Sequence, residues 1–285
     1  MTRPLAVAAL VLGLCGAASA QPLTGTLKAI KETGAIRLGH RDSSVPFSFV
    51  GPDKRPAGYS VELCERVAQV IRRDLGLADL RLVWVPVTVE TRIAAVVSGA
   101  IDLECGSTTN TLSRQREVDF STMIFVDGSG LLVAAGTGIS GVDQLTGKRV
   151  AVIPGTTTEP ALRQALGKLS VAAAIVPAKD HAEGLAALEA GRADAYASDR
   201  AILMGLYASA RDRDKLALTD VLMSVAPYGL MLRRGDPDFR LAVNRALAAI
   251  YRTDEIWEIY RRWFAALGRP GNLLSAMYLL YALPE

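Results

Sequence analysis

Residues 97–114, VSGAIDLECGSTTNTLSR, decide how the chain folds. An apolar helical run ends at Gly99, and AIDLE at 100–104 has the character of a short strand. Residues 106–111 are small or polar, and a second helical pattern follows them. The order helix, strand, loop, helix predicts an open α/β sheet, in which ligands bind where a strand ends and a helix begins.

The loop after this strand carries groups suited to an anion. Ser107 and Thr109 offer hydroxyl and backbone N–H groups, and Arg114 lies a turn further on. A guanidinium adds a fixed charge and a fork of donors for a carboxylate or phosphate. The same residues also suit a helix N-cap followed by a surface arginine, because Ser, Thr and Asn are common helix-starting residues. The residues alone leave both interpretations open.

Two more arginines follow predicted strands in the first half of the chain. Arg41 comes directly after the strand predicted at 35–40, and Arg92 lies on the first turn of the helix predicted at 91–97. Because parallel strands end at one edge of a sheet, we expect both side chains to lie near the loop that carries Ser107.

The second half of the chain carries three further candidates. His181 begins a predicted helix, Asp199 follows a predicted strand, and Thr157 lies in PGTTTE at 154–159. Asp199 would suit an amine, and Thr157 would offer its hydroxyl from the opposite side of a cleft. Each also has a structural interpretation, since Asp and Thr often cap helices and a lone histidine at a helix start is more often structural.

The order of the predicted elements indicates two lobes. Strands and helices alternate up to about residue 134, glycines then crowd together, and the alternation restarts at Lys148. SGAID at 98–102 is echoed by AGRAD at 190–194, each time between a helix and a strand. We expect a first lobe formed by residues 21–133 and 229–285, and a second lobe formed by 134–228. Two crossing segments would make a clamshell that closes by hinge motion.

The N-terminus has the features of a secretory signal peptide. Arg3 supplies the positive charge, residues 5–16 are apolar, and residues 18–20 form an A-x-A cleavage signal. We therefore expect residues 1–20 to be removed after Ala20 and the mature protein to reside in the periplasm.

Charge and cysteine content exclude some classes of function. The formal net charge is only +3, which points to no nucleic-acid partner and no membrane partner. Cys64 and Cys105 would remain in an oxidising compartment, where a disulfide and a buried free thiol are both open. No Cys or His spacing is typical of a metal site, so we expect neither a metal nor a cofactor.

Four motifs together resemble a known family. They are GHRDSSVPFSF at 39–49, ECGSTTN at 104–110 with Arg114, PGTTTE at 154–159 and AKDH at 178–181. In this order, between about Thr26 and Asn272, the chain resembles the periplasmic solute-binding proteins of polar amino acid ABC transporters (solute-binding protein family 3). It is most similar to the glutamate/aspartate-binding branch. The resemblance implies a two-lobed type II clamshell, each lobe a mostly parallel sheet flanked by helices, joined by two hinge strands.

The resemblance also assigns roles to residues. It implies that Arg114, Ser107 and Thr109 hold the α-carboxylate of an amino acid and that Asp199 takes its ammonium group. The positions that reach the side-chain carboxylate are matched by Arg41, Arg92 and His181. This much positive charge favours a diacid, because a buried guanidinium without a partner costs on the order of several kcal/mol. Beside a bound carboxylate we expect the charged form of His181 to be favoured.

The resulting function is the capture of an acidic L-amino acid, glutamate or aspartate, by a monomeric, non-enzymatic protein that delivers it to an inner-membrane permease. Val89 departs from the pattern, since the glutamate/aspartate branch tends to carry a small hydroxyl residue there, close to the side-chain subsite. The alternative is an enzyme similar to periplasmic cyclohexadienyl or arogenate dehydratases. Such an enzyme needs a general acid in the cleft, and Glu159 is the candidate.

Overall fold

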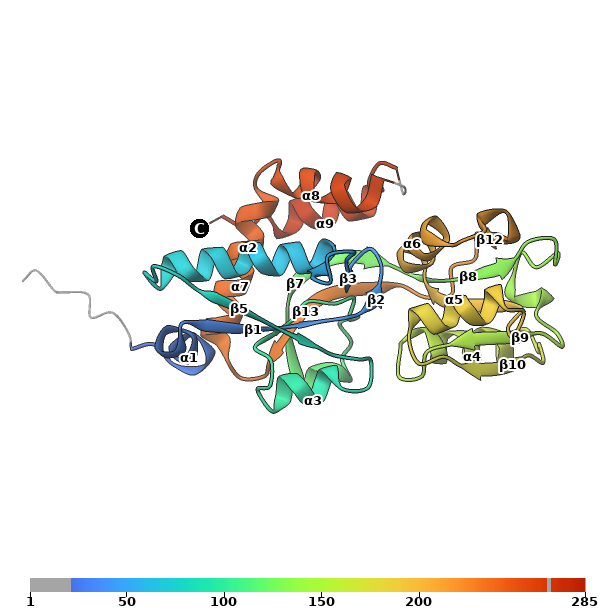
Figure 1. Ribbon diagram of the computed structural model, residues 1–285, viewed down its shortest axis with the longest axis horizontal. Helices are drawn as coiled ribbons and strands as arrows, with labels where there is room; N and C mark the ends of the chain where they lie inside the picture. The colour runs from blue at the N-terminus through green and yellow to red at the C-terminus, as the bar shows by residue number, and fades with distance from the viewer. Residues whose placement is uncertain (1–21, 266–267, 285) are drawn as a thin grey trace, which may run out of the picture.

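The computed structural model describes residues 22–265 and 268–284, which form two α/β lobes joined end to end (Figure 1). The expected two-lobed fold class is therefore confirmed. The predicted signal peptide at 1–20 and its cleavage site after Ala20 lie outside the described residues. Within the described part of the chain, every helix is too short or too polar to cross a membrane.

The first lobe is built on a five-stranded sheet. Its strands run in the order β5 (Arg81–Pro86), β1 (Ala35–His40), β6 (Leu103–Glu104), β13 (Ala226–Arg233) and β7 (Val118–Asp127). β1 pairs in parallel with β5 and β6, whereas β13 is antiparallel to both of its neighbours. All strands except β13 therefore point the same way, as expected for a mostly parallel sheet.

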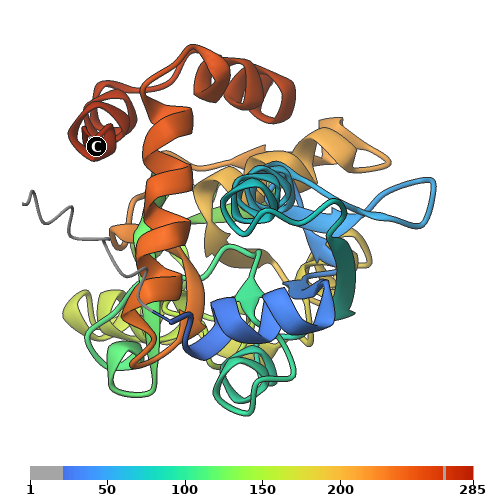
Figure 2. The same cartoon turned by 90° about the vertical axis from the view of Figure 1, so that its left-hand side faces the viewer.

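Helices cover both faces of this sheet (Figures 1 and 2). α3 (Arg92–Val97) packs on one face over a core that includes Val96, Phe120 and Met231. The other face is covered by α2 (Tyr59–Asp74), α7 (Pro237–Tyr251) and α9 (Asn272–Tyr281), the last of which packs on β7. α8 (Glu255–Phe264) packs against α2 and α7, and α1 (Gly25–Thr33) packs against α7. The hydroxyls of Tyr278 in α9 and Tyr59 in α2 lie 2.7 Å apart, so the apolar tail packs on the first lobe as predicted.

The second lobe repeats this construction. Its sheet has the order β10 (Ala174–Pro177), β9 (Arg149–Val152), β11 (Ala195–Asp199), β8 (Ser129–Ala134) and β12 (Leu216–Leu218). The flanking helices are α4 (Thr158–Lys168), α5 (His181–Glu189) and α6 (Arg200–Ser209). Side chains alternate between the two faces: Val150 and Val152 join the core beneath α4, while Ala151 joins the larger core on the other side.

Two neighbouring segments carry the chain between the lobes. The first passes from β7 to β8 through Gly128, where a Cβ atom would overlap the carbonyl oxygen of Ser224. The second enters the first lobe along β13, and Ala226 at its start pairs with Asp127 at the end of β7. In each sheet the strand that has just crossed, β8 or β13, is the one that runs against the others.

The pairing of β8 does not agree with the lobe boundary predicted after residue 133. β8 spans Ser129–Ala134 and pairs along its length with β11 and β12 of the second sheet. The glycine-rich stretch that suggested the boundary follows β8, whereas the chain crosses before it. We propose a division near Gly128 for the first crossing and near Ala226 for the return.

The segment after β1 forms a small sheet that sequence analysis did not predict. β2 (Ser43–Ser44), β3 (Ser48–Val50) and β4 (Pro56–Ala57) pair antiparallel, and the peptide bond between Val45 and Pro46 is cis. This turn lies against α6 of the second lobe, because a Cβ atom on Gly205 would lie 2.8 Å from the carbonyl oxygen of Val45.

The second helical pattern expected after residue 111 is only a short 3-10 helix, η1 (Arg114–Arg116). β7 begins at Val118, so the chain has no room for a longer helix. Similar single turns, η2 (Val142–Gln144) and η3 (Arg213–Lys215), lie in the second lobe.

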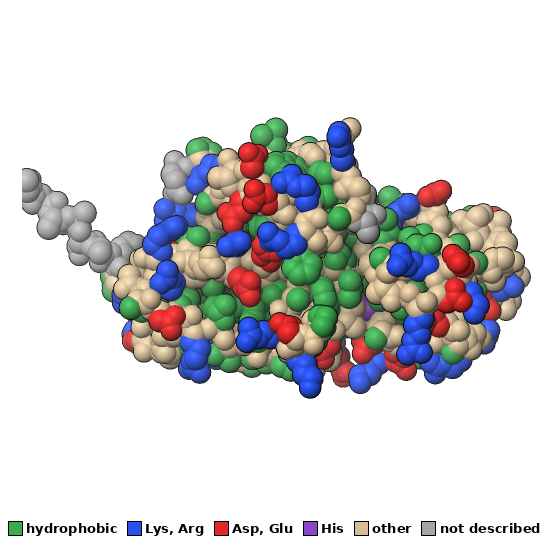
Figure 3. Space-filling view, turned by 45° about the horizontal axis from the view of Figure 1, so that its top comes forward, with side chains coloured by type: hydrophobic (Ala, Val, Ile, Leu, Met, Phe, Trp, Pro, Cys, Tyr) green, Lys and Arg blue, Asp and Glu red, His purple; other side chains and the backbone are tan. Residues whose placement is uncertain are grey.

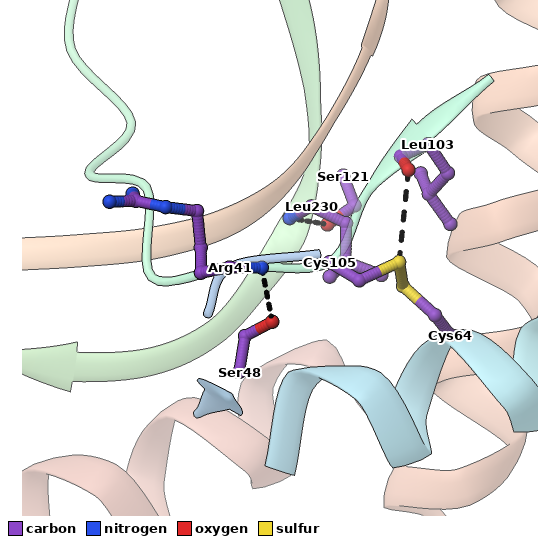
Figure 4. The surroundings of a disulfide bond; sticks show 7 residues. All are labelled: Arg41, Ser48, Cys64, Leu103, Cys105, Ser121 and Leu230. Carbon is purple, nitrogen blue, oxygen red and sulfur yellow. Dashed lines mark hydrogen bonds between the residues drawn. A yellow bond between two sulfur atoms is a disulfide. The ribbon is translucent and has the colours of Figure 1, made fainter. Parts of the chain in front are cut away.

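The two cysteines that sequence left open are bonded to each other. Cys64 of α2 and Cys105, directly after β6, form a disulfide that closes a separation of 41 residues (Figure 4). Both residues are fully buried. The bond ties α2 to the start of the loop that carries Ser107 and Thr109. The side chain of Arg41 extends away from it, as Figure 4 shows.

Replacing both Cys64 and Cys105 with alanine should destabilise the protein. A cross-link over 41 residues restricts the unfolded chain by about 4 kcal/mol in the chain-entropy estimate, which corresponds to a fall in melting temperature of about 10 °C. Calorimetric melting of both proteins measures the difference. As a control, dithiothreitol should lower the melting temperature of the native protein and leave that of the double variant unchanged. Equal melting temperatures would contradict the prediction.

Candidate functional site

A small polar cavity lies where the two lobes meet. It holds about 20 Å³, roughly the space of one water molecule. The eight side chains selected from the sequence all line it, and Val89, Thr156, Thr158, Ser198 and Ile202 complete the lining. In Figure 3 the lobes meet along a narrow seam, with acidic and basic side chains beside it at the lower edge. The lobes are therefore closed over the cavity.

The wall from the first lobe is dominated by buried arginines. Arg41 directly follows β1, Arg92 is the first residue of α3, and Arg114 is the first residue of η1. Their exposed fractions are 3%, 3% and 9%. Burial lowers the pKa of Arg41 and of Arg114 to about 10, with Arg92 adding to the effect, and burial also lowers the pKa of Arg92. At neutral pH the guanidiniums of Arg41 and Arg114 remain charged.

These guanidiniums are only partly satisfied by the protein. Arg92 Nη1 donates to Thr108 Oγ1 at 2.7 Å, but its buried Nε finds no acceptor among the described residues. Arg114 Nη1 donates to the carbonyl oxygen of Thr109 at 2.7 Å. Buried charged donors without acceptors are costly, so the wall is arranged for a negatively charged group.

Asp199 supplies negative charge from the second lobe. The hydroxyl of Tyr228 donates to its Oδ2, and the hydroxyls of Ser129 and Thr158 each donate to its Oδ1 at 3.3 Å. Burial raises the pKa of Asp199 above its ordinary value. Asp199 occupies the N-cap position of α6, but its side chain accepts no capping hydrogen bond. The capping interpretation therefore does not explain its side chain.

A second carboxylate, Asp127, stands behind Asp199 at the hinge. Its Oδ2 accepts from the backbone N–H of Ala201 at 3.0 Å. Burial and the charge of Asp199 raise the pKa of Asp127 to about 7. The two acids interact too closely to lose their protons independently.

His181 is buried in the second lobe, and the expectation that a bound carboxylate favours its charged form stays a prediction. It begins α5 after the N-cap Asp180, and its Nδ1 lies 2.7 Å from the hydroxyl of Tyr196. Burial and the charges of Arg41 and Arg92 lower the pKa of His181 to about 3, so the ring is neutral at pH 7 in this structure. A Tyr196 hydroxyl that donates to Nδ1 leaves the proton on Nε2, which makes the neutral ring a hydrogen-bond donor.

Three contacts join the lobes across the cavity. Arg114 Nη2 donates to the carbonyl oxygen of Gly155 at 3.2 Å. The hydroxyls of Thr109 and Thr157 lie 3.1 Å apart, although Thr157 holds the N-cap position of α4 and caps nothing with its side chain. Val89 meets Gly155, where a Cβ atom would lie 3.6 Å from Val89 Cγ1. Residues expected to bind ligand therefore also close the cleft.

Two residues near the cleft lie outside this site. Phe47 is fully buried among the rings of Tyr59, Phe125, Tyr228 and Phe264, where it forms part of the core. Glu159 accepts hydrogen bonds from Arg163 at 2.8 and 3.1 Å and does not line the cavity. In the described ranges, no group of three or more His, Cys, Asp or Glu side chains is placed to hold a metal ion.

Sequence reasoning missed several residues that shape the site. Glu104 is fully buried beside the arginines, and Tyr228 contacts Asp199 from the returning strand β13. The signal for Glu104 was present, because a charged residue inside an apolar strand is the informative exception to burial by hydrophobicity. Tyr228 carries no such signal, since tyrosine is common in ordinary strands.

The fold and site define a two-lobed protein whose lobes meet at a small cavity lined by charged side chains. The chain belongs to the bacterial extracellular solute-binding proteins, family 3, which match residues 36–266. It is 42% identical to the L-glutamate/L-aspartate-binding protein of Pseudomonas aeruginosa, over 86% of this chain and 82% of that protein. It is 36% identical to the glutamate/aspartate import solute-binding protein of Escherichia coli, over 93% and 88% of the two chains.

Solved structures show the same fold. An ancestral amino acid-binding protein, AncCDT-1, described as a precursor of cyclohexadienyl dehydratase, matches with a TM-score of 0.73 and 28% identity. The match covers 84% of this chain and 100% of AncCDT-1. The two-lobed fold is therefore that of known amino acid-binding proteins.

Replacing Asp127 with asparagine should flatten the pH dependence of stability in the ligand-free protein. A carboxyl group with a folded-state pKa of about 7, above its unfolded value, makes the folded state take up a proton between about pH 4 and 7. Asp127 therefore stabilises the fold most at low pH, and this contribution is lost as pH rises to 7. Melting temperatures at pH 5 and 8 should differ less in Asp127→Asn, with the variant gaining on the native protein at pH 8. Parallel curves for the two proteins would rule out the coupling.

Proposed function

We propose that the protein captures an acidic L-amino acid, glutamate or aspartate, between its lobes and delivers it to the membrane permease of an ABC importer. The observation that carries this proposal is the burial of Arg41, Arg92 and Arg114 around one small cavity. An amino acid with one carboxylate would leave buried guanidinium donors unpaired, whereas a diacid offers a second carboxylate. The names of the relatives support the same ligand class.

The geometry supports one arrangement of the ligand. Its ammonium group would lie against Asp199. Its α-carboxylate would accept hydrogen bonds from Arg114 and from the hydroxyls of Ser107 and Thr109. Arg41, Arg92 and His181 also line the cavity, and the two arginines lie close enough to His181 to lower its pKa. These three side chains would hold the side-chain carboxylate. The neutral His181 would act there as a hydrogen-bond donor, and Thr157 would close the second lobe over the ligand.

Delivery would depend on which form of the protein the permease recognises. The contacts of Arg114 with Gly155 and of Thr109 with Thr157 require that the lobes meet. A ligand that touches both lobes favours this closed form. A permease that docks only the closed form would therefore bind the ligand-loaded protein in preference to the empty one. We propose that the protein acts as a monomer in the periplasm, after cleavage behind Ala20.

We propose binding without turnover. The general acid considered from the sequence, Glu159, is paired with Arg163 of α4 and is not among the residues that line the cavity. Because the chain is similar to AncCDT-1, a precursor of cyclohexadienyl dehydratase, dehydratase activity is the alternative that the experiment has to test.

Calorimetric titration of refolded protein, freed of bound ligand, tests the proposal. L-glutamate or L-aspartate should bind with a dissociation constant of about 1 µM or lower, and L-glutamine at least tenfold more weakly. Arogenate incubated with the same samples should remain unchanged. Absence of binding by both diacids would overturn the proposed ligand, and conversion of arogenate would establish an enzyme instead.

Replacing Asp199 with asparagine should weaken glutamate binding about 100-fold. Asparagine keeps the size of the side chain and can still hydrogen-bond the hydroxyls of Tyr228, Ser129 and Thr158, but it removes the charge opposite the ligand ammonium. Calorimetry gives the loss, and a melting temperature close to that of the native protein shows that the fold is retained. Arg163→Gln, which disturbs only the exposed pair with Glu159, is the control expected to bind normally.

A further inference from the structure

Glu104 is a buried carboxylate that the proposed ligand contacts do not use. It is the last residue of β6 and is fully buried, with 0% of its surface exposed. Among the residues that the structure describes, none forms a hydrogen bond with either of its carboxylate oxygens. A charge in that position is costly unless nearby charges of opposite sign compensate it.

The compensating charges are the arginines of the cleft. A Cβ atom built on Gly106 would overlap Oε1 of Glu104 and lie 3.3 Å from Cγ of Arg41, so the carboxylate lies under the ligand loop beside Arg41. The charge of Glu104 raises the pKa of Arg41, Arg92 and Arg114 alike, opposing the effect of burial. Glu104 therefore acts on all of them through space and lies behind the cavity lining.

The balance of buried charge follows from this position. Three guanidiniums face the carboxylates of Glu104 and Asp199, and His181 is neutral, so one positive charge remains in excess. Asp127 is left out of this count because it does not line the cavity and because burial, together with the charge of Asp199, raises its pKa to about 7. An amino acid with two carboxylates and an ammonium group carries one net negative charge and removes the excess.

We propose that Glu104 is a specificity-determining residue, whose fixed negative charge behind the arginine wall sets the net charge of the preferred ligand at minus one. The inference rests on the proposed function, because it assumes that an amino acid occupies the cavity. Without Glu104 the cleft would carry a larger positive excess and would favour ligands of greater negative charge. A neutral ligand would gain nothing, because the effects on its ammonium and α-carboxylate oppose each other.

The test is Glu104→Gln, which removes the charge and keeps the shape. Calorimetry compares native and variant protein with three ligands that share the ammonium and α-carboxylate: L-glutamine, L-glutamate and 2-amino-4-phosphonobutyrate. Their side chains carry no charge, one negative charge and up to two at pH 8. The variant should bind glutamine within about threefold of the native protein and glutamate at least tenfold more tightly, with a larger gain for the phosphonate.

An equal loss for all three ligands would overturn the inference, since it would mean that Glu104 only supports the loop. Glu104→Asp, which keeps the charge, is the matched control and should preserve the native ranking. If the ligand-free variant is unstable, melting temperatures in saturating glutamate and glutamine give the same comparison, and equal stabilisation by both would overturn it. Failure of the native protein to bind either diacid is a separate result that would remove the proposed function.

Discussion

The burial of three guanidinium groups at the ends of parallel strands is the constraint on which the rest of the molecule depends. Arg41, Arg92 and Arg114 lose most of their hydration, and burial lowers the pKa of each. Carboxylates and other hydrogen-bond acceptors must compensate for this lost hydration. Asp199 provides one carboxylate, but it belongs to the other lobe. The electrostatics of the site are therefore complete only when the lobes meet.

The two sheets position these charges by the same means. In each sheet the strand arriving from the other lobe is reversed, so the parallel strands beside it end at the seam. The crossing segments lie next to each other through the pairing of Asp127 with Ala226. Tyr228 of the returning strand donates a hydrogen bond to Asp199, so a residue next to the hinge contacts a residue that lines the cavity. Residues at the hinge and residues at the cavity are therefore in direct contact.

Much of this arrangement follows from the sequence, and the remainder depends on long-range contacts. Period and turn residues located most of the helices and the longer strands, but not the small sheet formed by β2, β3 and β4 or the short strand β12. The position of each arginine after a strand predicted the shared cavity. The lowered pKa of His181 was not predicted, because it arises from burial beside Arg41 and Arg92. The division that we propose near Gly128 differs from the predicted one because β8 joins the second sheet by pairing with β11, which lies far along the chain. The local sequence pattern carries no information on the surroundings of His181 or on the pairing of β8.

The size of the closed cavity has a kinetic consequence. A space of about 20 Å³, lined by Arg114 and Asp199 among others, is too small to admit an amino acid while the lobes stay in this position. Every association and every release must pass through an open conformation. The residence time of a bound molecule is then limited by how often the hinge opens, and a partner that separates the lobes controls the moment of release.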